Sequence, residues 1–331
     1  MIKDELVALF EAASDGTLPA DFQGWRLVGN NGWTVAHEAA KNKHLPKDFD
    51  AWALADNDGR TVAHVAAEAR CEQLPEDFSD WTLADNSGHT VAHEAAEWRV
   101  FPKDFEHWAV ADCDGWTVAH EAASHDYLPL DFDQWEIADD YGWTVAHEAA
   151  EHRYLPQNFK KWELANTIGW TVAHEAARQD MLPDDFDRWE LRDIDGMTVA
   201  HVAVGSSNFP KDFKHWDWAD IQGWTVAHMA VYLGARLPED FDQWAMAAGD
   251  GLTVAHVAAL MGVLPDNFNQ WGLVVVGYEG IGLSVANLAL DGGFERQEDI
   301  DGEWCRSPYE DVCEYIGQIA NEYAEMREEK E

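Results

Sequence analysis

The sequence predicts an all-α fold, an α-solenoid of about ten to eleven stacked helix–turn–helix repeats with a C-terminal capping helix. The string Thr-Val-Ala-His occurs nine times, at steps of 27 to 29 residues. A second block, Leu/Phe-Pro-x-Asp/Asn-Phe-x-x-Trp, recurs ten times in alternation with the first. Self-similarity at a fixed short period indicates a stack of small units. We therefore expect an extended surface rather than a globule with one active site.

The two blocks define the parts of one repeat. Gly32 ends a turn, and the hydroxyl of Thr34 is suited to cap a first helix of small apolar residues. Pro46 is suited to the first position of a second helix, with Phe49 and Trp52 on its apolar side. A turn of Asp, Asn and Gly closes the repeat. Each repeat is thus predicted to contain two short helices and a turn.

The ends of the array differ from its middle. Residues 1–30 are predicted to form an N-terminal capping repeat, with Phe10 in the histidine position, and residues 31–271 are predicted to form the repeat array. Residues 272–331 are predicted to hold a degenerate last repeat and the C-terminal capping helix, which begins at a capping box in residues 307–310. End units of a stack differ because each covers only one neighbour.

Composition limits the classes of function and location. The 331 residues carry 63 Asp and Glu against 22 Lys and Arg, a net charge of −41, which disfavours direct binding to nucleic acid or an anionic membrane. Four scattered cysteines indicate neither a zinc site nor a disulfide framework, and they favour a reducing compartment. We expect no signal peptide and no membrane span. The predicted location is cytoplasmic, in the host-cell cytoplasm if a phage or pathogen encodes the chain.

The segment Gly-x-Thr-Val-Ala-His-x-Ala-Ala resembles the Gly-x-Thr-Pro-Leu-His-x-Ala-Ala of the ankyrin repeat. The acidic turn before it, as in residues 56–59, also matches, and the resemblance covers roughly residues 1–290. The chain departs from the family in its Val and Ala, in its shorter period and in the Leu-Pro-x-Asp-Phe-x-x-Trp block. Ankyrin-like arrays generally bind proteins and rarely catalyse a reaction, so the resemblance implies a protein-binding module.

The nine histidines form a candidate metal or catalytic column, and their spacing argues against both roles. Stacked helices lie roughly 8–10 Å apart, whereas the ligands of one zinc each lie about 2 Å from it. His-Glu-Ala-Ala recurs, but no second histidine follows in the place that a His-Glu-x-x-His site requires. In ankyrin-like units this histidine bonds to the turn and to the threonine. We therefore predict no catalytic residue, no metal and no cofactor.

The residue before each motif threonine varies, which makes it a candidate partner contact. In ankyrin-like arrays this position lies on the finger that faces partners, and Trp and Arg dominate interface energies. Alternatively, the rings fold down on neighbouring fingers and only staple the stack, and the sequence leaves both possibilities open. The predicted contact residues of this row are Trp33, Arg60, His89, Trp116, Trp143, Trp170, Met197 and Trp224.

Acidic residues also recur in columns, either to solvate the surface or to bind a partner. Eleven layers of roughly 10 Å would spread the charge at about 0.4 per Å, about two-thirds of the line charge of duplex DNA. Solubility of a small domain requires a net charge of only about 2–8, so the excess favours an electrostatic role. The predicted contact residues are Asp56, Asp85, Asp112, Asp139, Asp193 and Asp220 in the turns, and Glu121 and Glu148 after the histidines.

These observations predict a non-enzymatic protein that binds and inhibits a basic or nucleic-acid-binding protein through an extended negative face. Its specific form would be a nucleic-acid mimic that acts on a defence protein, as acidic phage anti-defence proteins do. The alternative is a scaffold or effector that recognises a neutral partner through tryptophan-bearing fingers. Salt distinguishes the two, because only the first depends on charge.

Overall fold

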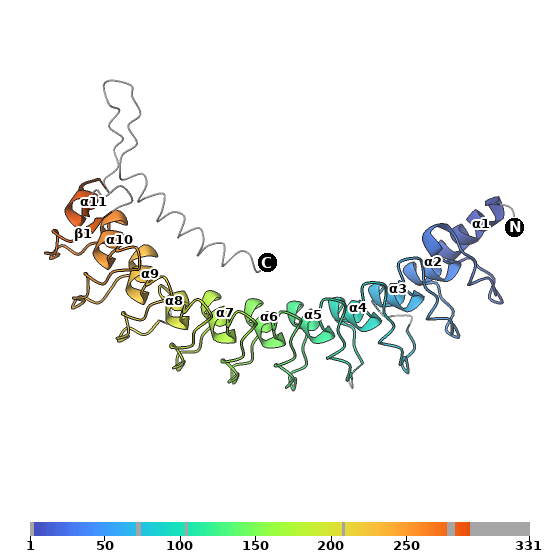
Figure 1. The fold of residues 1–331 in the computed structure, drawn as a ribbon. Coiled ribbons are helices and arrows are strands. Elements are labelled where there is room, and N and C mark those ends of the chain that lie inside the picture. The colour runs from blue at the N-terminus through green and yellow to red at the C-terminus, as the bar shows by residue number, and fades with distance from the viewer. Residues whose placement is uncertain (1–2, 71–73, 103–104, 207–208, 277–281, 292–331) are drawn as a thin grey trace, which may run out of the picture. The chain divides into compact units, whose positions relative to one another are not determined.

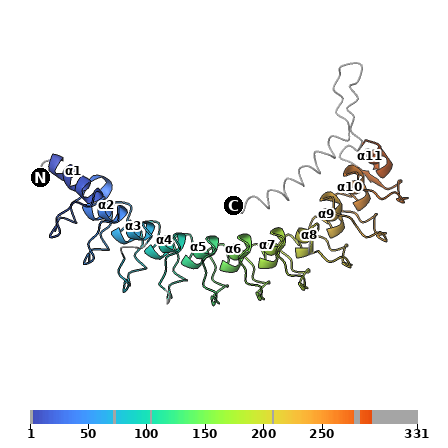
Figure 2. The same cartoon turned by 180° about the vertical axis from the view of Figure 1, so that it is seen from behind.

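The computed structural model describes residues 3–70, 74–102, 105–206, 209–276 and 282–291. The chain divides into two compact units, residues 1–181 (unit 1) and residues 182–331 (unit 2). Within each unit the helices follow one another in chain order, and the loops of successive repeats project to the same side (Figures 1 and 2). The predicted all-α solenoid is confirmed.

The repeat helices are short and nearly uniform in length, because each is built from the same motif. The helices of unit 1 are α1 (Lys3–Ser14), α2 (Val35–Lys41), α3 (Val62–Glu68), α4 (Val91–Glu97), α5 (Val118–Ser124), α6 (Val145–Glu151) and α7 (Val172–Arg178). Those described in unit 2 are α8 (Val199–Ala203), α9 (Val226–Tyr232), α10 (Val254–Leu260) and α11 (Val285–Asp291). A single 3₁₀ turn, η1 (Asn30–Gly32), precedes α2.

Each helix from α2 to α10 begins with a reciprocal cap between threonine and histidine. In α3, the hydroxyl of Thr61 accepts from the backbone N–H of His64, and Nδ1 of His64 accepts from the backbone N–H of Thr61 at 3.1 Å. The amides of Val62 and Ala63 donate to carbonyls of the preceding segment. All the amides of the first turn are thereby satisfied, which stabilises helices far shorter than the ~12–15 residues that an isolated helix needs.

Where the structure describes the second block, the predicted second helix does not form, and two tight turns stand in its place. Phe49 N–H donates to the carbonyl of Pro46 (3.1 Å), and Leu54 N–H donates to that of Ala51 (3.2 Å). The carbonyls of Leu54 and Trp52 accept instead from Val62 and Ala63, the first two residues of α3. The backbone of this block thus satisfies amides at the start of the following helix, which have no partner within that helix.

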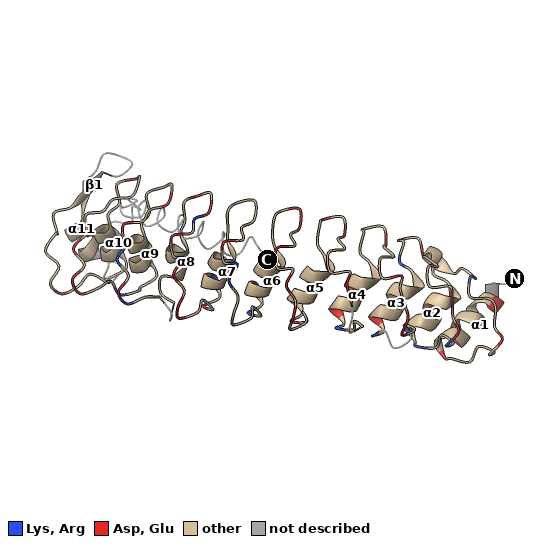
Figure 3. Cartoon of the chain, turned by 90° about the horizontal axis from the view of Figure 1, so that it is seen from below, with Lys and Arg blue, Asp and Glu red and all other residues tan. Residues whose placement is uncertain are grey.

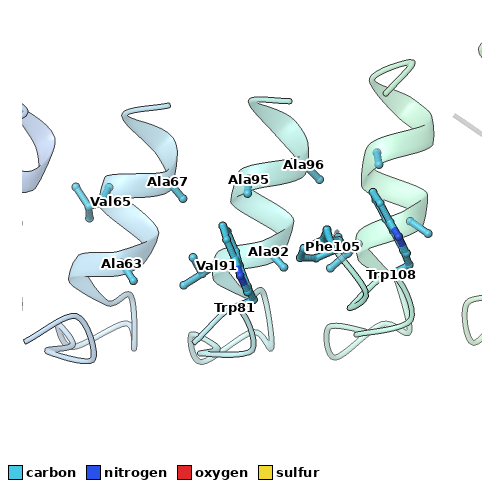
Figure 4. Close-up of a cluster of buried hydrophobic side chains, with 14 of the residues drawn as sticks. Ala63, Val65, Ala67, Trp81, Val91, Ala92, Ala95, Ala96, Phe105 and Trp108 are labelled. Atoms are coloured by element: carbon cyan, nitrogen blue, oxygen red, sulfur yellow. The ribbon is translucent and has the colours of Figure 1, made fainter. Parts of the chain in front are cut away.

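The core lies between successive helices and the Phe-x-x-Trp blocks. The motif Val and Ala side chains are completely buried, as in Val62, Ala63 and Ala66. The aromatic rings form an edge-to-face ladder, in which Trp25, Phe49 and Trp52 lie 5.7 and 4.9 Å apart in turn. Figure 4 shows Trp81 against Val91 and Ala92 of α4, with Phe105 and Trp108 at the next layer.

The two ends use variants of the repeat. Near the N-terminus, Phe10 of α1 packs in a cluster with Val35 and Ala39 of α2. In unit 2 the strands β1 (Val274–Val276) and β2 (Gly282–Ser284) pair antiparallel before α11. Asn287 of α11 then accepts from the backbone N–H of Ser284 at 3.3 Å, in the place of the histidine. The predicted C-terminal capping helix lies outside the described residues, and the predicted segment boundaries stay predictions.

Within the described part of the chain, no helix has both the length and the apolarity needed to cross a membrane.

Candidate partner-binding surface

The turn before each motif is held by its own acidic side chain. Oδ1 of Asp56 accepts from the backbone N–H groups of Asp58 (3.0 Å) and Arg60 (2.9 Å). The same pair of bonds recurs in later turns, and Asn166 makes it with an amide oxygen, bonding Ile168 and Trp170. This Asx turn needs an oxygen rather than a charge. The predicted turn acids that make it are Asp56, Asp85, Asp112, Asp139, Asp193 and Asp220.

Successive turns are close together. Asn86 N–H donates to the carbonyl of Asp58 at 2.9 Å, which links two neighbouring turns. Gly59 lies between them with φ +83°, and a Cβ there would lie 2.7 Å from the backbone nitrogen of Asn86. Only glycine satisfies both the left-handed conformation and this approach. The turns of one unit therefore form a rigid ladder rather than independent loops.

Within each unit, the histidines link successive repeats through a directional series of hydrogen bonds. Nδ1 of His64 accepts from Thr61 N–H, so Nε2 carries the proton and donates to the carbonyl of His89 at 3.0 Å. That carbonyl shares a peptide group with Thr90, whose N–H donates to His93. Imidazoles and peptide groups thus alternate along the stack, an arrangement in which each bond polarises the next.

The histidines are held neutral by this environment. Burial lowers the pKa of His120 from 6.5 to about 4, although the bond to the carbonyl of Trp143 partly raises it. Burial likewise lowers the pKa of His64, His93, His201 and His228 to about 4. Among the described residues, no three His, Cys, Asp or Glu side chains gather in a group that could hold a metal ion.

The tryptophans of the predicted contact row fold inward onto their own helix. The ring of Trp143 lies 4.7 Å from that of His147, and its Nε1–H donates to Oε2 of Glu148 at 3.0 Å. Trp33, Trp116 and Trp170 make the same stack and bond. The indole edge that a partner would use as a donor is therefore already engaged.

Burial of this row varies along the chain. Trp33, Trp116 and Trp143 are half-buried. Trp170, Met197 and Trp224 are buried, with only 1% of Trp224 exposed. Arg60 pairs with Glu68 at 2.7 Å and Glu94 at 2.8 Å, and His89 lies 5.0 Å from the ring of His93. The part that these residues play toward a partner stays a prediction.

The glutamates that follow the histidines also face inward. Glu148 is 6% exposed, and burial raises its pKa to about 7, while the indole N–H of Trp143 partly lowers it. Glu121 is half-buried, accepts from Trp116 at 3.0 Å and lies 3.4 Å from His125. These carboxylates hold the tryptophans in place.

A different row of acids is exposed, and the sequence analysis missed it. The aspartate before the phenylalanine of the second block is on the surface wherever it is described. We call these residues the carboxylate row: Asp21, Asp48, Asp77 and Asp131 in unit 1, and Asp185, Asp212 and Asp240 in unit 2. Their recurrence was visible in the sequence. The row was overlooked because this position falls within the second helix that was predicted for each repeat.

Acidic charge is shared between the two units. Residues 1–181 hold 34 Asp and Glu against 13 Lys and Arg, and residues 182–331 hold 29 against 9. Figure 3 shows acidic residues, in red, along the loops of both units. The excess is therefore a property of the repeat and not of one terminal segment.

Comparison with known proteins gives no family. No protein-family model matches the chain, and no curated protein matches its sequence. The ankyrin-like relationship accordingly stays a prediction, which rests on the repeat motif alone.

Proposed function

We propose that this chain is a non-enzymatic binding protein that captures and inhibits a basic protein partner. In its specific form it is a nucleic-acid mimic that occupies the binding surface of a DNA- or RNA-binding protein. The observation that carries the proposal is the carboxylate row, which presents one exposed aspartate per repeat in most repeats of each unit. A protein surface that has evolved to bind phosphates is positively charged, and a regular row of negative charge would attract it.

The proposal concerns the carboxylate row rather than the turn acids for a physical reason. In the turns, Oδ1 of each aspartate already accepts two backbone N–H groups, as Asp139 does from Tyr141 (2.9 Å) and Trp143 (2.7 Å). These aspartates are also only partly exposed, which limits the approach of a charged partner. The exposed aspartates of the carboxylate row can bind lysine or arginine without disturbing a turn.

The alternative, a neutral partner held by tryptophan fingers, has less support. The rings of Trp116 and Trp143 lie on the histidines of their own helices, and their N–H groups bind Glu121 and Glu148. Recruiting them would require breaking both contacts. We further propose a cytoplasmic location, in the host-cell cytoplasm if a phage or pathogen encodes the chain.

The test compares two triple variants that remove the same charge from different rows. Asp48→Asn, Asp77→Asn and Asp131→Asn neutralise three of the four acids of the carboxylate row in unit 1, where asparagine already stands at Asn158. Asp56→Asn, Asp85→Asn and Asp139→Asn neutralise turn acids, where Asn166 shows that an amide suffices. The two sets therefore change net charge equally and keep the fold.

Binding is measured to an oligolysine peptide and to nucleic-acid-binding proteins captured from a cell lysate. Each measurement is repeated at increasing NaCl concentrations and with duplex DNA as a competitor. We expect the wild type to lose affinity steeply with salt, and DNA to displace its captured proteins. The carboxylate-row variant should bind more weakly, with a shallower salt dependence, than the turn variant. Salt-independent binding, or captured proteins that DNA does not displace, would refute the proposal. Equal losses in both variants would refute the assignment to the carboxylate row.

A further inference from the structure

The tips of the turns change character part-way along the chain. Each tip is the pair of residues between the turn acid or amide and the glycine. The tips at 57–58, 86–87 and 113–114 hold Asn, Asp, Ser and Cys. The tips at 140–141 and 167–168 each carry one large apolar side chain, with Tyr141 70% and Ile168 38% exposed. We call Tyr141 and Ile168 the apolar tips.

The same change recurs in unit 2, which argues against chance. Ile194 is 63% exposed and Ile221 is 70% exposed, each at the tip of its own turn. Isolated exposed apolar residues are common on protein surfaces. Here they occur at the tips of four successive repeats, as the second residue of the tip in unit 1 and the first in unit 2, whereas the tips before and after them are polar or small.

The apolar tips are held rigidly. Thr167 N–H donates to the carbonyl of Tyr141 at 2.9 Å, which ties the two tips together. Asp139 and Asn166 each hold the backbone of their own tip through Oδ1. A ligand that covers both side chains would therefore lose little conformational entropy in ordering the surface.

The charge around the apolar tips selects the kind of ligand. Asp140 occupies the same tip as Tyr141, and Asp114 lies at the preceding tip, and both are exposed. No lysine or arginine occurs at the tips of unit 1. An acidic or uncharged segment would leave these carboxylates unmatched, whereas a basic one would pair with them.

We propose that the apolar tips are a docking site for a segment of the partner that combines lysine or arginine with large apolar side chains. The apolar side chains of that segment cover Tyr141 and Ile168, and its cations pair with Asp114 and Asp140. This inference rests on the proposed function, because it assigns a specific contact to the same basic partner. Charge brings the partner to the protein, and the apolar tips decide which basic partner is retained.

The test uses two peptides of equal length and charge, one alternating Lys with Gly and one alternating Lys with Leu. They are titrated against the full chain near physiological salt, where charge alone is partly screened. The variant is Tyr141→Ser with Ile168→Ser, since Ser87 stands at the corresponding tip position of an earlier repeat. The control is Leu130→Gln, which removes a fully exposed apolar side chain away from the tips, where the next repeat has Gln157.

The wild type should bind the Lys–Leu peptide at least about tenfold more tightly than the Lys–Gly peptide. The serine variant should lose that preference and still bind the Lys–Gly peptide within about twofold of the wild type. Leu130→Gln should change neither affinity. Retained preference in the serine variant, or equal loss in Leu130→Gln, overturns the docking site alone. Absence of salt-sensitive binding to the Lys–Gly peptide overturns the proposed function instead.

Discussion

Acidification from pH 7 to pH 5 should destabilise the array through its buried histidines. In the folded chain, burial lowers the pKa of His120 from 6.5 to about 4. Between those two values the unfolded chain binds a proton at this site and the folded chain does not. The contribution of His120 to the free energy of unfolding is therefore fully present above pH 6.5 and is lost as the pH falls toward 4.

The size of the effect follows from the two pKa values. For each such histidine, the free energy of unfolding of the protein should fall by roughly 2 kcal/mol between pH 7 and pH 5. The slope of the unfolding free energy against pH is about 1.2 kcal/mol per pH unit near pH 5.5. His64, His93 and His120 contribute in unit 1, and His201 and His228 in unit 2. Their summed loss is on the order of 10 kcal/mol, comparable with the whole stability of a typical domain.

Some acids act in the opposite direction. Burial raises the pKa of Glu148 to about 7, so its folded form gains stability as the pH falls. That gain offsets about one histidine. Burial also raises the pKa of Glu94 and Glu151, which reduces the net loss further. The pH dependence of the wild type alone is therefore a sum of opposing contributions.

A single substitution isolates the histidine contribution. His120→Asn removes one titrating group, and Asn287 shows that asparagine can hold the same cap. Urea unfolding is followed by fluorescence from pH 7 to pH 5 at fixed high salt, which screens the repulsion among the acids. The slope of stability against pH should fall by about 1.2 kcal/mol per pH unit in His120→Asn. Equal slopes in His120→Asn and the wild type would refute the reasoning.

Three further results are expected. Gly59→Ala should destabilise unit 1 by about 2 kcal/mol or more in thermal unfolding, because φ is +83° and the new Cβ meets the Asn86 backbone at 2.7 Å. Gly234→Ala, where φ is +71° and no atom lies within 4 Å of the new Cβ, should lower the free energy of unfolding by only about 1 kcal/mol. Equal losses in the two glycine variants would contradict the importance of the close approach between turns. Trp143→Phe keeps a ring over His147 but removes the N–H donor to Glu148, so a carboxyl NMR titration should show a still higher pKa for Glu148. Asp139→Ala should lower the free energy of unfolding by about 1–2 kcal/mol in chemical denaturation. Asp139→Asn should lower it by under about 0.5 kcal/mol, since Asn166 makes the same two bonds. Similar losses in both variants would mean that the charge, and not the oxygen, holds the turn.

Much of the fold was readable from the sequence because the interactions involved are local. The threonine cap, the glycine of the turn and the Asx bond of Asp56 each join residues at most four positions apart. Residue type alone indicates such bonds, and their recurrence indicates the stack. The burial of most Phe-x-x-Trp pairs was predictable from their recurrence, since an aromatic pair that is present in every repeat can pack against the same pair in the next repeat.

The candidate surface was less predictable, because exposure depends on the direction that each side chain takes in the folded repeat. Trp143 could have pointed outward or inward, and in the folded chain it lies on its own helix and donates to Glu148. The sequence places Asp139 in a turn, but only the structure shows that Asp131 stays on the surface while Asp139 is partly buried.

The sequence by itself determined the repeat, the caps, the turns and the excess of negative charge, because those properties depend on composition and on neighbours along the chain. Only the tertiary structure showed that the second block forms two tight turns, whose carbonyls accept from amides of the following repeat. It also decided which acids and apolar side chains remain on the surface. Backbone groups must find hydrogen-bond partners, and this block finds them in its turns and in the next repeat, so it needs no helix to satisfy them.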